Sequence, residues 1–309
     1  MTSLVQKRLF WFTAIFLIAA FFLPVYSRAY VLGLLTVGFY FAIFSMSWDL
    51  LFGYAGEVNF GPTFLIGLGA YTAGILNSRY GLAIPWCIAA GSLAAVVGGV
   101  ILALPALRLK GPYFGLITLV AVLLMLNVVV VGASVTGGEI GLTIPDVIAI
   151  DPVANYYIAL ALMVVSGGVL FFISRSPVGL ILQAIGQNSV EAAALGFNVA
   201  KHKLAAFVVS AFFTGMAGAF LAFYLGTASV GTMIDVSVGV QIIIGAVLGG
   251  RRTIVGAVLG AIFMIAAGEA LRPFGTLSTF IVSLIALIVI MVAPGGFLGL
   301  MLHRKEQLT

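Results

Sequence analysis

Charged residues are scarce in this chain of 309 residues, where they make up only 7% of the total. Soluble domains carry about 25% charged and roughly 45–50% apolar residues, whereas hydrophobic residues here reach 63%. A soluble fold would therefore lack the polar side chains needed to cover its surface. The mean hydropathy of +1.26 agrees, so we expect a lipid bilayer to surround most of the chain.

Cysteine and histidine are nearly absent. The single cysteine, Cys87, excludes an intrachain disulfide, and His202 and His303 have no Cys or carboxylate neighbours at metal-ligand spacing. We therefore expect no metal site and no cofactor. The sequence also lacks a phosphate-binding loop of the GxxxxGKS or GxxxxGKT type, an HExxH motif and a Ser/His/Asp arrangement. These absences argue against an ATPase domain or an enzyme within the chain.

Long apolar runs are what the sequence has instead. A helix that crosses a bilayer needs about 20 apolar residues, and ten segments qualify as candidates: 10–25, 30–52, 61–78, 84–105, 113–132, 156–174, 204–224, 236–250, 254–271 and 277–292. The segment 236–250 is short and suits a half-helix or a re-entrant element. We therefore predict an all-α, polytopic membrane protein with eight to ten transmembrane helices. Lys7 and Arg8 precede the first run as in a signal peptide, but nine further runs favour an uncleaved first span.

The basic residues orient these segments. With the N-terminus in the cytoplasm and the sides alternating, eleven Lys or Arg residues fall inside and three outside, as the positive-inside rule expects. Both termini are then cytoplasmic, and the net charge of +5 reflects membrane orientation and not nucleic-acid binding. The inside set is Lys7, Arg8, Arg108, Lys110, Arg175, Lys201, Lys203, Arg251, Arg252, Arg304 and Lys305, and the outside set is Arg28, Arg79 and Arg272.

The longest polar stretch, residues 175–203, falls on the cytoplasmic side. Ser189 suits the N-cap of a short Ala-rich helix with Glu191 in its first turn, where the helix dipole favours an acid. Gly196 and Asn198 are expected to end this helix. A short rigid helix tied to two spans could dock a cytoplasmic partner or serve only as a solvated connector.

Several motifs resemble those of permease subunits of ATP-binding-cassette importers for branched-chain amino acids. Glu191, Ala192, Ala193 and the following Gly196 are similar to the EAA loop of importer permeases. Further similar runs, in the family's order, are GYAGEVNFGPTFLIGLGAYTAG (53–74), LRLKGPYF (107–114), TGG (136–138), GFNVAKHKLAAFVVSAFFTGMAG (196–218), GGRRTIVG (249–256) and PGGFLG (294–299). The glycine follows Glu-Ala-Ala after two residues instead of three, and residues 58–62 depart from the SFGH of many members. Urea, amide and sugar permeases of the wider family therefore stay open as alternatives.

The resemblance implies a division of labour among subunits. Residues 1–309 would form one transmembrane permease domain in the bacterial inner membrane, with 175–203 as its cytoplasmic coupling loop. A second related permease would complete the pore, preferably as a heterodimer, and an external binding protein would deliver the solute. Cytoplasmic ATP-binding subunits would dock on Glu191, Ala192, Ala193 and Gly196 and drive alternating access.

The stretch 53–62 is the candidate solute path. It holds three glycines, a proline, Glu57 and Asn59, but no Lys or Arg. Irregular backbone at membrane depth survives only where protein buries it or where it lines a watery cavity, and broken helices suit small polar solutes. We therefore expect Glu57, Asn59 and Gly61 to line the path. A second broken stretch, 226–235, would be its partner in an inverted repeat.

Further ionisable residues within membrane segments join the candidates, because such residues are functional by default. They are Asp49, Glu269 and the pair Arg251–Arg252, which could instead mark the cytoplasmic mouth of a turn. The alternative is structural: Asp49 and Glu57 would cap helix ends, and Glu269 would pair with Arg272 three residues later on the same helix face. An ion-gradient-driven secondary carrier is the competing function, and it would make Asp49, Glu57 or Glu269 indispensable.

Overall fold

The computed structural model describes residues 3–107 and 113–275, together with the single residues Leu277, Ile281, Leu284 and Gly296. The predicted span 277–292 lies outside the described residues apart from three of these positions. Most of the motif 294–299 and the basic residues Arg108, Lys110, Arg304 and Lys305 also lie outside them.

Long helices coincide with the predicted apolar segments. They are α1 (Ser3–Tyr26), α2 (Ala29–Asp49), α3 (Pro62–Tyr80), α4 (Ile84–Ala106), α5 (Tyr113–Val131), α7 (Pro152–Arg175), α10 (Val199–Leu225), α12 (Val236–Gly249) and α13 (Ile254–Ala270). In the part of the chain that the structure describes, the only strands are two of two residues each, β1 (Leu142–Thr143) and β2 (Thr227–Ala228). The predicted all-α fold is therefore confirmed.

Among the residues that the structure describes, six helical stretches are long and apolar enough to cross a membrane: Ala29–Tyr54, Ile84–Ala106, Tyr113–Val131, Pro152–Arg175, Val199–Leu225 and Val230–Gly249. Within the last stretch, α12 alone has 14 residues, or about 21 Å, which is less than the roughly 30 Å of a hydrocarbon core. The polytopic prediction is confirmed, and the number of eight to ten spans stays a prediction.

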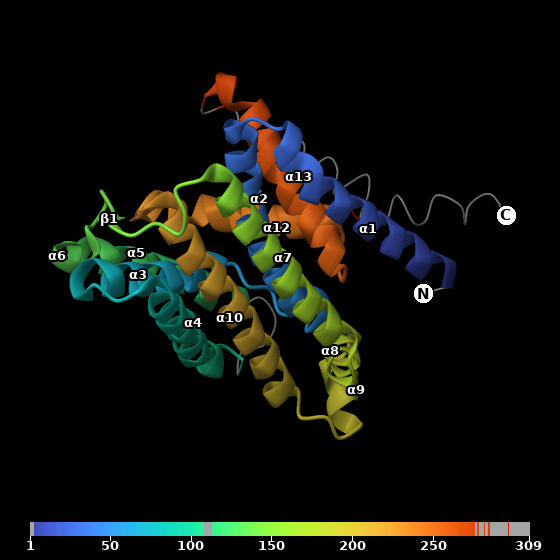
Figure 1. Ribbon diagram of the computed structural model, residues 1–309. Helices are drawn as coiled ribbons and strands as arrows, with labels where there is room; N and C mark the ends of the chain where they lie inside the picture. Colours follow the sequence, from blue (N-terminus) through green and yellow to red (C-terminus); the bar gives the residue numbers. More distant parts are fainter. Residues whose placement is uncertain are drawn as a thin grey trace.

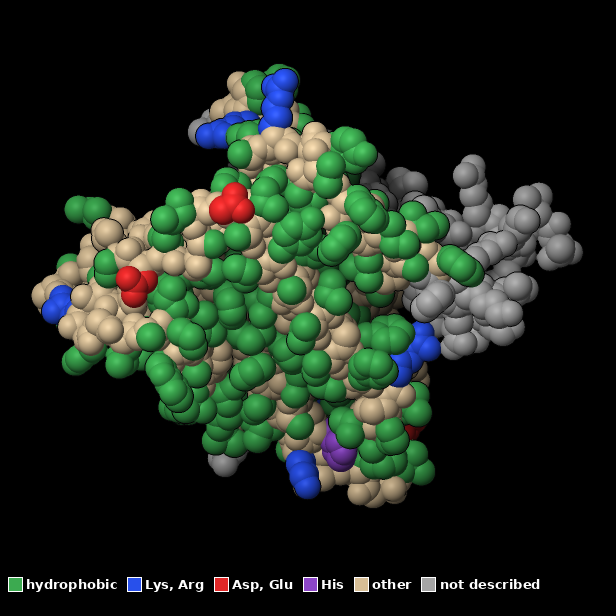
Figure 2. Space-filling model, in the orientation of Figure 1, with side chains coloured by type: hydrophobic (Ala, Val, Ile, Leu, Met, Phe, Trp, Pro, Cys, Tyr) green, Lys and Arg blue, Asp and Glu red, His purple; other side chains and the backbone are tan. Residues whose placement is uncertain are grey.

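The outer surface matches a lipid environment. Hydrophobic side chains cover most of the face seen in Figure 2, and the basic side chains lie at its edges. Exposed large apolar residues such as Trp86, Leu124 and Phe172 recur on the long helices. Water would penalise an apolar surface of this extent, whereas lipid does not.

Glycines bring the helices into backbone contact. A Cβ at Gly69 of α3 would collide with the carbonyl oxygen of Gly215 in α10, and one at Gly91 of α4 would collide with that of Gly69. These three helices lie side by side (Figure 1). In α12 and α13, a Cβ at Gly249 or Gly260 would likewise strike the facing backbone. Small residues permit such packing where lipid offers no hydrophobic force between helices.

The remaining short elements gather at two ends of the bundle. At one end lie the π-helix η1 (Leu50–Tyr54), α8 (Pro177–Gln187) and α9 (Ser189–Ala194). The other end holds α6 (Ala133–Thr136), the strands and α11 (Val230–Met233), and the 3-10 helix η2 (Arg272–Phe274) follows α13. Figure 1 shows α8 and α9 beyond one end of α7 and α10, far from β1.

At the second end of the bundle, β pairing joins two loops that are distant in the sequence. Strands β1 and β2 are antiparallel, with Leu142 opposite Ala228, and the Ile144 N–H donates to the Gly226 carbonyl at 2.9 Å. The Asn77 side chain at the end of α3 donates to Asp146 at 2.7 Å. The structure thus brings together loops that the charge pattern assigns to the external side, 133–155 and 226–235. That both termini are cytoplasmic stays a prediction.

Candidate functional site

The predicted coupling helix is α9, and its N-cap lies one residue earlier in the sequence than expected. Asn188, not Ser189, is the N-cap: its side-chain oxygen accepts from the N–H groups of Val190 at 3.0 Å and Glu191 at 3.3 Å. Its amide nitrogen also donates to Oε1 of Glu191 at 2.6 Å. Both residues are good caps by type, so composition could not separate them.

Of the two residues that were expected to end α9, Gly196 and Asn198, only Gly196 does so. Gly196 has a φ of 92° and its N–H donates to the Ala193 carbonyl at 3.0 Å, which is the left-handed ending that favours glycine. Asn198 does not end α9 and instead caps α10, accepting from the Lys201 N–H at 3.0 Å. α10 therefore starts at Val199, earlier than the predicted 204, because its polar first turn carries no hydropathy signal.

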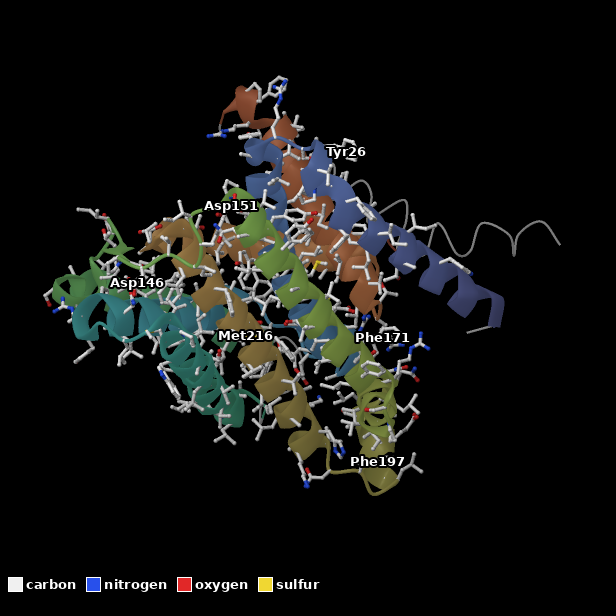
Figure 3. All side chains as sticks on the ribbon, in the orientation of Figure 1. Tyr26, Asp146, Asp151, Phe171, Phe197 and Met216 are labelled. Carbon is white, nitrogen blue, oxygen red and sulfur yellow. The ribbon has the colours of Figure 1, made fainter. Side chains whose placement is uncertain are left out.

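The surface of α9 is open. Ala192 is buried against its neighbours, whereas Glu191, Ala193 and Gly196 are exposed. The apolar Val190 and Leu195 are also about three-quarters exposed, at 76% and 77%. Figure 3 shows Phe197 just beyond this helix, at the opposite end of the molecule from Asp146 and Asp151. Exposed apolar side chains grouped on one short helix are a feature of surfaces that bind a protein partner.

Residues 50–61, called the break from here on, interrupt the helices between α2 and α3. The first five residues of the break form the π-helix η1, and the backbone that follows is neither helix nor strand. The indole of Trp48 donates to the Asn59 carbonyl at 2.7 Å, and the Gly61 N–H donates to the Asn59 side chain at 2.8 Å. The Phe60 N–H donates to the Thr118 hydroxyl at 3.0 Å. The predicted interruption is real, and protein contacts satisfy its backbone as burial requires.

The carboxylates in and beside the break, Glu57 and Asp49, contact residues of distant helices and turns. Glu57 forms an ion pair with Lys203 of α10, and both side chains are only about one-sixth exposed, at 15% and 16%. Asp49, at the end of α2, is buried and accepts from the Arg252 N–H at 3.0 Å. Arg252 Nε donates to the Gly53 carbonyl at 2.9 Å. Four candidate solute-path residues, Asp49, Glu57, Asn59 and Gly61, thus belong to one region.

Glu269 lies elsewhere. Its Oε1 accepts from Arg272 at 3.1 Å and from the hydroxyl of Tyr30. Both contacts lie at the end of α13 beside the start of α2, away from the break (Figure 1). The expected pairing of Glu269 with Arg272 is confirmed, and the structure does not bring this residue together with the other candidates.

Sequence reasoning missed the partners of these candidates. Lys203, Arg252 and Gly186 each contact the break or Asp49. The charge alternation had assigned Lys203 and Arg252 to the same side as the break, which was the available signal. It could not pair them, because Lys203 and Glu57 are 146 residues apart in the chain.

Comparisons with known proteins agree with this picture. Residues 30–294 match the family described as "Branched-chain amino acid transport system / permease component". The chain is 27% identical to the high-affinity branched-chain amino acid transport permease LivM of Escherichia coli and 26% identical to that of Salmonella typhimurium. Each alignment covers 96% of this chain and 76% of the relative. A probable branched-chain amino acid permease of Methanocaldococcus jannaschii is 24% identical over 62% of this chain and 66% of its own length. No solved structure matches.

Proposed function

This chain belongs to the family of permease components of branched-chain amino acid transport systems, and we propose that it is the membrane-spanning subunit of an ATP-driven importer of branched-chain amino acids. The family match over residues 30–294 carries the proposal. The multi-pass helical fold and the exposed helix α9 support it.

In this proposal, ATP is hydrolysed by separate cytoplasmic subunits that dock on α9. The docking surface comprises Glu191, Ala192, Ala193 and Gly196. Glu191 is exposed beside the apolar Val190, which supports this role. Short turns also join α9 to α8 and α10, so α9 can pass a displacement to both helices. A second, related permease completes the pore, and an external binding protein delivers the solute on the side of β1 and β2.

The break is the proposed lining of the solute path. Asn59 and Gly61 form a turn of buried backbone, and such backbone suits a zwitterionic solute. Glu57 and Asp49 already have partners in Lys203 and Arg252. A solute that engaged Glu57 would therefore compete with Lys203, whereas Asp49 keeps one buried oxygen, Oδ2, without a hydrogen-bond partner among the described residues. The Glu57→Gln variant tests this role, and an unchanged solute affinity would remove Glu57 from the path.

The competing substrates are urea, amides and sugars, and the competing mechanism is a secondary carrier. A carrier would depend on the embedded carboxylates Asp49, Glu57 and Glu269 for ion coupling. The ion pairs and hydrogen bonds of these three residues favour structural roles instead.

Affinity purification in mild detergent from the native host tests the assembly. We expect an ATPase and a second permease to accompany the chain. Purification of the chain alone, with a normal amount of folded protein, would contradict the importer and favour the carrier.

A further inference from the structure

The break is in direct backbone contact with the coupling loop. Gly56 has a φ of 76°, and a Cβ placed on it would lie 2.9 Å from the Cα of Gly186 in α8. A Cβ on Gly186 would in turn collide with the carbonyl oxygen of Tyr54. Two glycines therefore let α8 cross the break with no side chain between the two backbones, and a shift of α8 must move the break.

A second contact attaches the other end of the coupling loop to the same place. Lys203, in the second turn of α10, forms the ion pair with Glu57, next to Gly56. Both partners are largely shielded from water, where an ion pair is screened less than on the surface. Of the helices that flank α9, α8 thus contacts residue 56 and α10 contacts residue 57.

The opposite side of the break is bound to the turn between α12 and α13. Asp49 and the Gly53 carbonyl accept from the N–H and Nε of Arg252, and the Tyr54 hydroxyl donates to the Arg252 carbonyl at 2.9 Å. The Arg251 guanidinium lies 4.4 Å from the centre of the Phe52 ring. Arg252 has a φ of 64°, a left-handed conformation that costs a non-glycine residue energy and is held by these bonds.

We propose that the break is a mechanical link that carries displacement of the coupling loop to the α12–α13 turn. Gly56, Gly186 and the Glu57–Lys203 pair receive the movement, and Asp49 with Arg252 passes it on. These are positioning residues: they act through the helices and need not touch the solute. The inference rests on the proposed function and adds a route by which ATP hydrolysis reaches the α12–α13 turn.

The test uses the assembled complex in proteoliposomes, and measures leucine uptake per ATP hydrolysed together with the KM for leucine. The variants are Glu57→Lys, Lys203→Glu and the double exchange. Each single exchange places like charges together, so we expect the uptake-to-hydrolysis ratio to fall about tenfold, within the usual range of coupling between sites. The double exchange restores the opposite charges and should recover most of the ratio.

Gly186→Ala is the second variant, and Gly168→Ala in α7 is its matched control. A Cβ at Gly168 would meet no atom of the described residues within 4 Å. We expect only Gly186→Ala to lower the ratio while the ATPase still co-purifies.

Single exchanges with a wild-type ratio would overturn the link, as would a double exchange that fails to recover it. A changed KM with an unchanged ratio would also overturn it and assign Glu57 to the solute path. Loss of ATPase from the wild-type complex would instead refute the proposed function itself.

Discussion

Two interruptions of the helices, the break and residues 226–235, are held by different contacts. The break bonds to elements far away in the chain: Glu57 pairs with Lys203, 146 residues distant, and Gly53 bonds to Arg252, 199 residues distant. Residues 226–235 pair as β2 with β1, and otherwise use local bonds such as that from the Ser237 N–H to Asp235 at 2.7 Å.

The two interruptions therefore depend on different neighbouring elements. The break lies under the coupling loop, so its geometry depends on where α8 and α10 sit. Residues 226–235 contact the loop that contains β1 and cap α12 through Asp235, so they depend on the opposite end. Variants that weaken one end should therefore leave the function of the other intact.

Glu191→Arg should give the largest effect. It reverses the exposed charge in the proposed docking surface, and we expect uptake to fall about tenfold or more, as for a strong interface residue. The measurement is uptake together with the amount of co-purified ATPase. Glu139→Arg is the control, because Glu139 is exposed in the loop near β1. Equal losses of co-purified ATPase in the two variants would refute a docking role confined to α9.

Arg252 comes next, because it joins the break to the α12–α13 turn. Arg252→Ala and Arg252→Gly both lose the bond to the Gly53 carbonyl, but only alanine must hold a left-handed φ of 64°. We expect the alanine variant to be less stable by about 1 kcal/mol. Thermal unfolding in detergent measures this difference. A more stable alanine variant would mean that the backbone at this position is not held left-handed.

The N-caps of α9 and α12 lie at the two opposite ends of the molecule and allow a finer comparison of these ends. Asn188→Ala and Asp235→Ala each remove an N-cap, of α9 and α12 respectively, at about 1 kcal/mol of stability. Only Asn188→Ala should also weaken ATPase binding, because Asn188 orients Glu191. A titration of the purified permease with its ATPase distinguishes the two, and similar affinities would contradict the role of α9.

Asp146→Asn should have the smallest effect. It weakens the bond from Asn77 by removing a charged acceptor, at a cost of about 1 kcal/mol or less. Limited proteolysis should cut the loop around residues 137–151 faster, while uptake per ATP stays unchanged. A reduced ratio would show that the two ends of the molecule are coupled more tightly than this account allows.

Much of the fold was predictable because lipid imposes a simple rule on sequence. Each apolar segment predicted within the described residues is a helix, and the glycine-rich stretch 53–62 does interrupt two of them. The wrong predictions concern places where polar residues determine where a helix begins. Asn188 and Ser189 are equally suitable caps, and the start of α10 at Val199 lies in a polar turn that hydropathy does not detect.

The site was predictable only where its partners are neighbours in the chain. Glu269 at the end of α13 and Arg272 at the start of η2 are three residues apart, so their pairing follows from local geometry. The Glu57–Lys203 pair and the crossing of Gly56 by Gly186 depend on how α2, α8 and α10 pack. No local pattern encodes that packing, so the break could be recognised in the sequence but its partners could not.

Leucine uptake by proteoliposomes that contain the complete complex, with ATP inside or outside, tests the central claim most directly. With the binding protein present on the external face, we predict uptake that requires ATP on the cytoplasmic face and persists when proton and sodium gradients are collapsed. Uptake by the chain alone, driven by an imposed proton or sodium gradient and indifferent to ATP, would contradict the importer and place the embedded carboxylates at the centre of transport.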